Sequence, residues 1–92
     1  MGVGRMEVHP PLPMPDQTID TSGRFCPFPI VETARAFRSL EPGAVLLVIA
    51  TDPGVIHDMP MWCKATRNEH ITTFRDGSSW KSYLRKSEAK GR

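Results

Sequence analysis

Cys26 is the residue of this sequence best placed to do chemistry. It lies in the segment Gly23-Arg-Phe-Cys26-Pro27-Phe-Pro29, between a short β-type stretch and an amphipathic helical pattern. If Cys26 is the helix N-cap and Pro27 the first helical residue, the sulfur lies beside the positive end of the helix dipole. Such a position lowers a thiol pKa from about 8.5 to between roughly 3.5 and 7.5. The pattern therefore predicts a reactive thiolate at Cys26.

The residues around the cysteine are expected to shape its loop. Pro27 and Pro29 stiffen the turn and carry no N–H. Phe28 is among the few residues left to offer an early helix amide, which argues against a broad phosphate cradle. Gly23 breaks the strand pattern, and Arg24 is a cation two residues from the thiol that can stabilise thiolate and steer an acidic partner. An isolated cysteine is often a buried small hydrophobe, but this turn favours an exposed, reactive one.

The second cysteine is expected to be structural. Cys63 lies beside Trp62 inside a helical pattern, where burial is the usual role of a free cysteine. A Cys26–Cys63 disulfide, and with it a thiol–disulfide regulator, stays open at this point. It requires Cα atoms within about 7 Å.

Other kinds of site are poorly supported. The cysteines and the three histidines show no ligand-pair spacing for zinc, so no metal and no bound cofactor are expected. Asp52 and Asp58 are interpreted as helix caps, and His57 as a solvated residue. The sequence contains no nucleophilic triad, no acid–base pair and no Gly-rich nucleotide loop.

Hydrophobic periodicity predicts the elements that position Cys26. Strands are expected over 17–21, 44–50, 70–74 and 80–85, and helices from about 27 to 40 and about 59 to 68. The predicted helical face of the first helix comprises Ile30, Ala34, Phe37 and Leu40. The order β-α-β-α-β-β predicts an α+β two-layer sandwich, with two helices packed on one face of a four-stranded mixed sheet.

Length and composition predict one small domain. The chain has 92 residues, a formal net charge of +2 and 39% hydrophobic residues, which fits a single globular unit with a thin core. We expect a flexible proline-rich arm over 1–15, the domain over 16–86 and a frayed basic tail over 87–92. The longest apolar run, 44–50, is far shorter than the ~20 residues of a membrane span. Together with two cysteines and no apolar leader, this predicts a cytoplasmic protein.

Basic residues near the C-terminus suggest an alternative function. They are Lys81, Arg85, Lys86, Lys90 and Arg92. With Trp80 and Tyr83 as exposed aromatics, they would support a non-catalytic module that binds RNA or a partner protein. A continuous basic groove is missing, so direct binding of nucleic acid is not expected. A solvated strand edge and tail is the favoured interpretation.

The sequence resembles the TusA/SirA-like family of small sulfur-carrier proteins. The match begins with Asp20, Gly23 and the CPxP motif Cys26-Pro27-Phe28-Pro29. It continues through 40–43, 51–53 and 58–63 to the closing 83–86, and covers about residues 17–86. The chain departs from the family pattern at Ser22, Arg24 and Phe25, which flank the predicted reactive loop.

The resemblance implies a function for Cys26. Members of the family carry sulfane sulfur as a persulfide on this cysteine, received from a cysteine desulfurase or a rhodanese-like donor. They pass it to acceptor proteins for transfer-RNA thiolation, cofactor synthesis or sulfur oxidation. A sulfurtransferase acting in a relay, with Gly23, Arg24, Pro27, Phe28 and Pro29 shaping its reactive loop, is therefore the leading hypothesis. A persulfide carrier needs an exposed nucleophile and no deep pocket, which a thin domain can provide.

Overall fold

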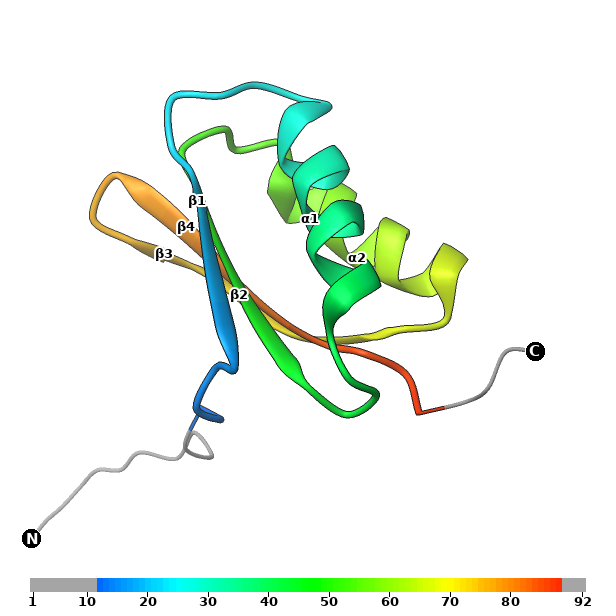
Figure 1. Cartoon of the computed structure of the whole chain (residues 1–92). Helices are drawn as coiled ribbons and strands as arrows, with labels where there is room; N and C mark the ends of the chain where they lie inside the picture. Colours follow the sequence, from blue (N-terminus) through cyan, green and yellow to red (C-terminus); the bar gives the residue numbers. More distant parts are fainter. Residues whose placement is uncertain (1–11, 89–92) are drawn as a thin grey trace, which may run out of the picture.

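The computed structural model describes residues 12–88, which form two layers (Figure 1). The elements are β1 (Gln17–Thr21), α1 (Phe28–Ser39), β2 (Val45–Ala50), α2 (Val55–Thr66), β3 (Glu69–Asp76) and β4 (Ser79–Arg85). The sheet order is β1-β2-β4-β3, with β1 parallel to β2 and the other neighbours antiparallel. Both helices lie on the same face of the sheet. The predicted α+β sandwich and its element order are confirmed.

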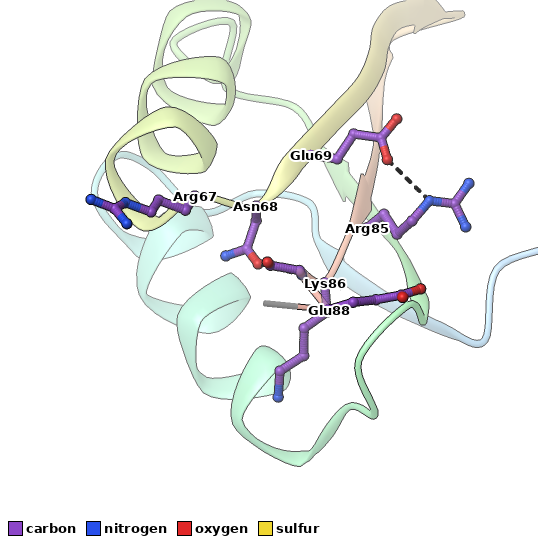
Figure 2. A pocket seen from close by; sticks show the side chains of 7 residues that line it. Arg67, Asn68, Glu69, Arg85, Lys86 and Glu88 are labelled. Carbon is purple, nitrogen blue, oxygen red and sulfur yellow. Dashed lines mark hydrogen bonds and ion pairs between the residues drawn. The ribbon is translucent and has the colours of Figure 1, made fainter. Parts of the chain in front are cut away.

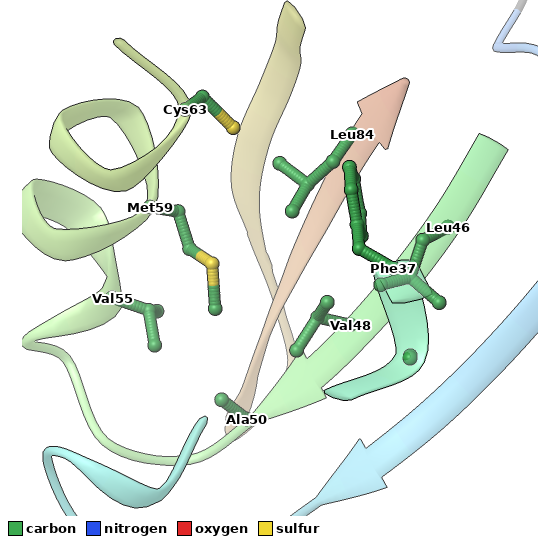
Figure 3. Close-up of a cluster of buried hydrophobic side chains, with 9 residues drawn as sticks. Phe37, Leu46, Val48, Ala50, Val55, Met59, Cys63 and Leu84 are labelled. Carbon is green, nitrogen blue, oxygen red and sulfur yellow. The ribbon is translucent and has the colours of Figure 1, made fainter. Parts of the chain in front are cut away.

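The core lies between this face of the sheet and the helices (Figure 3). Leu46 of β2 is paired with Leu84 of β4, and both are fully buried. Met59 and Cys63 of α2 approach them from the helical layer. Trp80, Ser82 and Leu84 share the inner face of β4, since Ser82 and Leu84 are buried and Trp80 packs against the core. Trp80 is therefore not the exposed aromatic that the sequence suggested.

The buried face of α1 agrees with the predicted one in part, since Phe37 lies in the core and Ile30 and Leu40 pack against it. Its buried residues are Pro29, Thr33, Ala36 and Phe37, whereas Ile30, Ala34 and Leu40 are only partly buried. Thr33 can occupy the centre of the interface because its hydroxyl donates a hydrogen bond to the Pro29 carbonyl at 2.7 Å. A search for apolar residues at helical spacing does not identify a buried polar residue whose hydrogen bond is made within the helix.

Helix α2 begins earlier than predicted. It starts at Val55, with Gly54 as N-cap, and Pro60 lies inside the helix. Pro60 removes the hydrogen bond to the Ile56 carbonyl, and the helix tolerates this because Ile56 lies on its exposed side. Asp58 therefore lies within the first turn, and Asp52 precedes the helix, accepting a bond from the Gly54 amide at 3.0 Å. Neither aspartate is the N-cap residue that the sequence indicated.

The predicted arm and tail fall partly outside the described residues. Residues 12–15 belong to no helix or strand, and residues 1–11 and 89–92 are not described. The arm enters β1 through Asp16, whose amide donates to the Val45 carbonyl and whose carboxylate accepts from the Val45 amide, each at 2.8 Å. Within residues 12–88, no helix is long and apolar enough to cross a membrane.

The described basic residues of the C-terminal region all have partners within the chain. Lys81 pairs with Asp76 at 2.8 Å, and Arg85 pairs with Glu69 at 3.1 Å. Lys86 Nζ donates to two main-chain carbonyls at the end of α1, whereas Lys90 and Arg92 lie outside the described residues. Tyr83 is half-buried and stacks on Phe74. A shallow pocket of about 350 Å³ lies here, lined by residues 67–69 and 85–88 (Figure 2).

Lys86→Ala is expected to destabilise the domain by about 1–3 kcal/mol. Its ammonium group donates to the carbonyls of Phe37 and Leu40, each at 2.7 Å, and so caps the negative end of α1. Urea unfolding measures the change. Lys64→Ala is the control, because it removes a lysine from the exposed side of α2. Equal midpoints for the two variants would contradict the capping role.

Candidate functional site

Cys26 lies in the loop between β1 and α1, at the carboxyl ends of the parallel strands β1 and β2 (Figure 1). The thiol is free and exposed. The loop that follows β2 holds this segment. Thr51 Oγ1 accepts a bond from the Gly23 amide at 2.9 Å, and Asp52 Oδ2 accepts one from the Cys26 amide at 2.7 Å. The cysteine is thus positioned by residues about 26 positions later in the chain.

Gly23 allows the chain to turn out of β1. Its φ is +81°, a conformation that other residues rarely adopt, and a Cβ there would meet no atom within 4 Å. Glycine is therefore favoured at this position by its backbone conformation and not by a lack of space for a side chain. Just before it, the buried Thr21 donates its hydroxyl to the Ile49 carbonyl at 2.8 Å, which fixes the end of β1 against β2.

The predicted N-cap is displaced by one residue. Pro27 is the N-cap of α1, the helix begins at Phe28, and Cys26 precedes the cap. The Phe28 amide donates to the Phe25 carbonyl at 2.7 Å, so it does not face an incoming anion. Pro29 is buried and anchors the helix start to the core layer. Cys26 consequently lies outside the first helical turn.

Arg24 and Phe25 form the outer rim of the loop. The Arg24 guanidinium lies over the Phe28 ring, 4.3 Å from its centroid, and the side chain remains exposed. Phe25 is 75% exposed. An exposed phenylalanine next to an exposed thiol is a feature of surfaces that another protein covers.

The surroundings of Cys26 raise the pKa of its thiol above its ordinary value. The causes, largest first, are hydrogen bonding to Asp58, partial desolvation, and the negative charges of Asp58 and Asp52. The predicted lowering of this pKa by the α1 dipole is therefore wrong. The amides of Gly54 and Cys26 stabilise the Asp52 carboxylate and lower its pKa, which keeps it charged beside the sulfur.

Cys63 has the structural position that the sequence predicted. It is 1% exposed, and its sulfur lies in the core beside the sheet (Figure 3). Burial raises its pKa to about 12. Both cysteines are free thiols, one exposed and the other buried, so the structure does not join them in a disulfide. Within residues 12–88, no three His, Cys, Asp or Glu side chains gather to hold a metal ion.

Sequence reasoning placed the cysteine loop correctly in the chain but missed its two acidic neighbours. The order of the predicted strands already indicated that the residues after β2 lie near the Cys26 loop. Asp52 lies two residues after the end of β2, and the carboxyl ends of two paired parallel strands meet at one edge of a sheet. That placement brings Asp52 to the Cys26 loop, and Asp58 follows within the first turn of α2.

Comparison with known proteins places the chain in a family. The family model described as Sulfurtransferase TusA matches residues 17–86. A curated relative from Aquifex aeolicus (strain VF5), named as a sulfur carrier protein, is 38% identical over 72 residues, which cover 78% of this chain. The match spans only 36% of that relative's length.

A solved structure shares the fold. The crystal structure of the SirA-like protein from Desulfitobacterium hafniense superposes with a TM-score of 0.69 and 20% identity, covering 78% of this chain and 99% of that one. Its two-layer architecture agrees with the fold described above. On the family match over 17–86, which includes the Cys26 loop and the helices and strands of the described residues, the chain belongs to the TusA sulfurtransferase family.

Proposed function

We propose that Cys26 carries sulfane sulfur as a persulfide between a donor protein and an acceptor protein. The observation that supports this most directly is the free, exposed thiol on a loop that hydrogen bonds fix to the neighbouring strand end. The donor is a cysteine desulfurase or a rhodanese-like protein. The acceptor serves transfer-RNA thiolation, cofactor synthesis or sulfur oxidation, and the relay operates in a reducing cytoplasm.

The proposed loading step is an exchange between two sulfur–sulfur bonds. The Cys26 thiolate attacks the outer sulfur of the donor persulfide, and the inner donor sulfur leaves with the bonding electron pair. One S–S bond forms and one breaks, and the donor thiolate takes up the proton that Cys26 gave up. Cys26–SH and donor–S–SH become Cys26–S–SH and donor–SH, with no net oxidation. Delivery to the acceptor follows the same chemistry, with Cys26 as the leaving group.

The surface around Cys26 suits a reaction between proteins. Phe25, the residue before Cys26, is 75% exposed. A docking partner would cover such apolar groups and exclude water from the reacting sulfurs. No bound cofactor is required, because the persulfide itself is the transferred group.

Intact-mass measurement tests the proposal. The protein is incubated with a cysteine desulfurase and cysteine, and its mass is compared with that of the untreated protein. A carrier gains one sulfur, which a thiol reductant removes again. No gain would contradict the proposal and favour the binding module, and a loss of two hydrogens would indicate a dithiol switch. The internal partners of Lys81, Arg85 and Lys86 already weigh against a nucleic-acid surface.

Arg24→Glu is expected to slow sulfur transfer from the donor protein at least several-fold while leaving stability nearly unchanged. Arg24 is exposed on the loop that carries the thiol, and the change reverses a charge within the proposed docking surface. Loading rates at several donor concentrations, with thermal unfolding alongside, measure the effect. Arg38→Glu, on the exposed side of α1, is the control, because it reverses the same charge away from the Cys26 loop. Wild-type loading by Arg24→Glu would place the docking surface elsewhere.

A further inference from the structure

The loop between β1 and α1 is exposed, yet side chains from a distant part of the sequence hold its main chain. Gly23 and Cys26 are both exposed residues. The Gly23 amide donates to Thr51 Oγ1 at 2.9 Å, and the Cys26 amide donates to Asp52 Oδ2 at 2.7 Å. Two adjacent side chains thus bind the two ends of a four-residue segment. We call Thr51 and Asp52 the loop clamp.

The loop clamp is itself fixed to the two elements that flank it. Thr51 directly follows the last residue of β2. Asp52 Oδ1 accepts a hydrogen bond from the Gly54 amide at 3.0 Å, and the Asp52 carbonyl accepts one from the Val55 amide at 3.3 Å. One carboxylate oxygen therefore binds the start of α2, while the other binds Cys26. The main chain of the cysteine takes its position from β2 and α2.

The other bonds of the loop are local. The Arg24 amide donates to the Thr21 carbonyl at 3.1 Å, and the Phe28 amide donates to the Phe25 carbonyl at 2.7 Å. These bonds close turns between residues that are near in sequence. The loop clamp differs from them, because it joins the loop to a segment 26–28 positions away.

The direction of the attacking sulfur matters when sulfur passes between two proteins. The thiolate must lie in line with the S–S bond that breaks, and a displacement of about 1 Å can slow a reaction about 100-fold. A small soluble reagent can approach an exposed thiol from any open side. The persulfide of a docked protein approaches from one direction. A fixed cysteine therefore favours transfer between proteins and has little effect on reaction with small reagents.

We propose that Asp52, with Thr51 beside it, is a positioning residue for sulfur transfer, which fixes the main chain of Cys26 so that its sulfur meets the persulfide of a docked donor in line. This inference rests on the proposed function, since it concerns the geometry of the proposed carrier cysteine. Asp52 forms and breaks no bond to sulfur. Its effect is on the rate of transfer, beyond its contribution to stability.

Asp16 provides a matched control for Asp52. Asp16 Oδ2 accepts a hydrogen bond from the amide of Val45, 29 residues later, at 2.8 Å, beside the amino ends of β1 and β2. Asp16→Ala and Asp52→Ala each remove a carboxylate that binds a main-chain amide far away in sequence, but one of them is at the opposite end of the strands from Cys26. Asp52→Asn keeps one oxygen acceptor and is the second variant if Asp52→Ala unfolds.

Two reaction rates test the positioning role. The first is single-turnover loading from the preformed persulfide of a cysteine desulfurase, at several concentrations of excess donor. The second is alkylation of Cys26 by iodoacetamide. Asp52→Ala is expected to lower the maximal loading rate about tenfold or more, with the half-saturating donor concentration within about twofold of wild type. Its alkylation should equal or exceed that of wild type, because losing a nearby negative charge favours thiolate. Asp16→Ala should match wild type in both rates, and Asp52→Asn should lie between.

Hydrogen exchange of main-chain amides, followed by NMR, tests the loop clamp without any sulfur. The amides of Gly23 and Cys26 should exchange at least about tenfold more slowly than amides of an unstructured peptide, although their loop is exposed. Asp52→Ala should remove this protection from Cys26, and Thr51→Val should remove it from Gly23.

The outcomes separate the positioning role from the proposed function. If wild type loads sulfur, equal maximal loading rates of Asp52→Ala and Asp16→Ala overturn the positioning role alone. Faster loading by Asp52→Ala, or equal slowing of its loading and its alkylation, overturns it as well, because charge or loss of the fold then explains the result. An unprotected Cys26 amide in wild type overturns the loop clamp. Failure of wild type to gain sulfur overturns the proposed function, and slow exchange at Cys26 would then show a clamp that is structural.

Discussion

Cys26→Ser is expected to reduce persulfide loading to background and to leave the fold intact. A serine hydroxyl does not attack a persulfide under these conditions, since it is far less acidic and less nucleophilic than a thiol. Serine keeps the amide that donates to Asp52 Oδ2 at 2.7 Å and has nearly the same shape. The β1–α1 loop should therefore keep its position. Intact mass after incubation with a desulfurase and cysteine measures loading, and thermal unfolding measures the fold.

Cys63→Ala is the matched control for this result. This substitution removes the other thiol from the core. The variant protein should still gain one sulfur, on Cys26. Peptide mapping of the loaded wild-type protein locates the sulfur directly. Sulfur on Cys63, or loading that survives in Cys26→Ser, would show that Cys26 is not the carrier.

Cys63 is expected to make the domain less stable at alkaline pH. Burial raises its pKa from 9.0 to about 12, whereas in the unfolded chain a cysteine releases its proton near pH 8.5. Between these values the unfolded state binds fewer protons than the folded state, so stability falls as pH rises. The contribution of the protonated Cys63 thiol to the free energy of unfolding is fully present below about pH 8.5. Up to about 4 kcal/mol of it is lost by pH 12.

Denaturant unfolding from about pH 7 to 11 measures this dependence. Tyrosines and lysines also titrate there, so the informative quantity is the difference between wild type and Cys63→Ala. That difference should shrink steadily above about pH 8.5. A constant difference would mean that the thiol ionises as readily in the core as in the unfolded chain. The same burial should make Cys63 at least about 100-fold slower than Cys26 toward iodoacetamide near neutral pH.

The elements of this fold could be predicted because each has a strong local signal. β2 is an uninterrupted apolar run, the hairpin turn contains Gly77 with a φ of +66°, and β4 alternates between buried and half-buried residues. These patterns depend on a few neighbouring residues, and the order of the elements follows from them. The start of α2 was misplaced because Pro60 looks like a helix start, although the chain tolerates it in an exposed turn.

The chemistry of the site could be predicted only in part, because it depends on contacts between distant residues. The loop motif predicts Cys26 as the reactive residue, and the structure places it in an exposed loop before α1. The sign of its pKa shift was wrong, because a dipole argument considers α1 alone. Asp52 and Asp58 act on the thiol from another loop and helix and raise its pKa, and α1 begins two residues beyond the cysteine.

The bonds from Thr51 and Asp52 to the β1–α1 loop mean that the first half of the chain does not contain its own site. As the protein is synthesised, Cys26 emerges before Asp52, which holds its amide, by 26 residues. Until β2 pairs with β1 and α2 begins, Cys26 is an ordinary cysteine of a growing peptide. The loop that holds Cys26 is thus completed only when the two β-α units of the chain have come together.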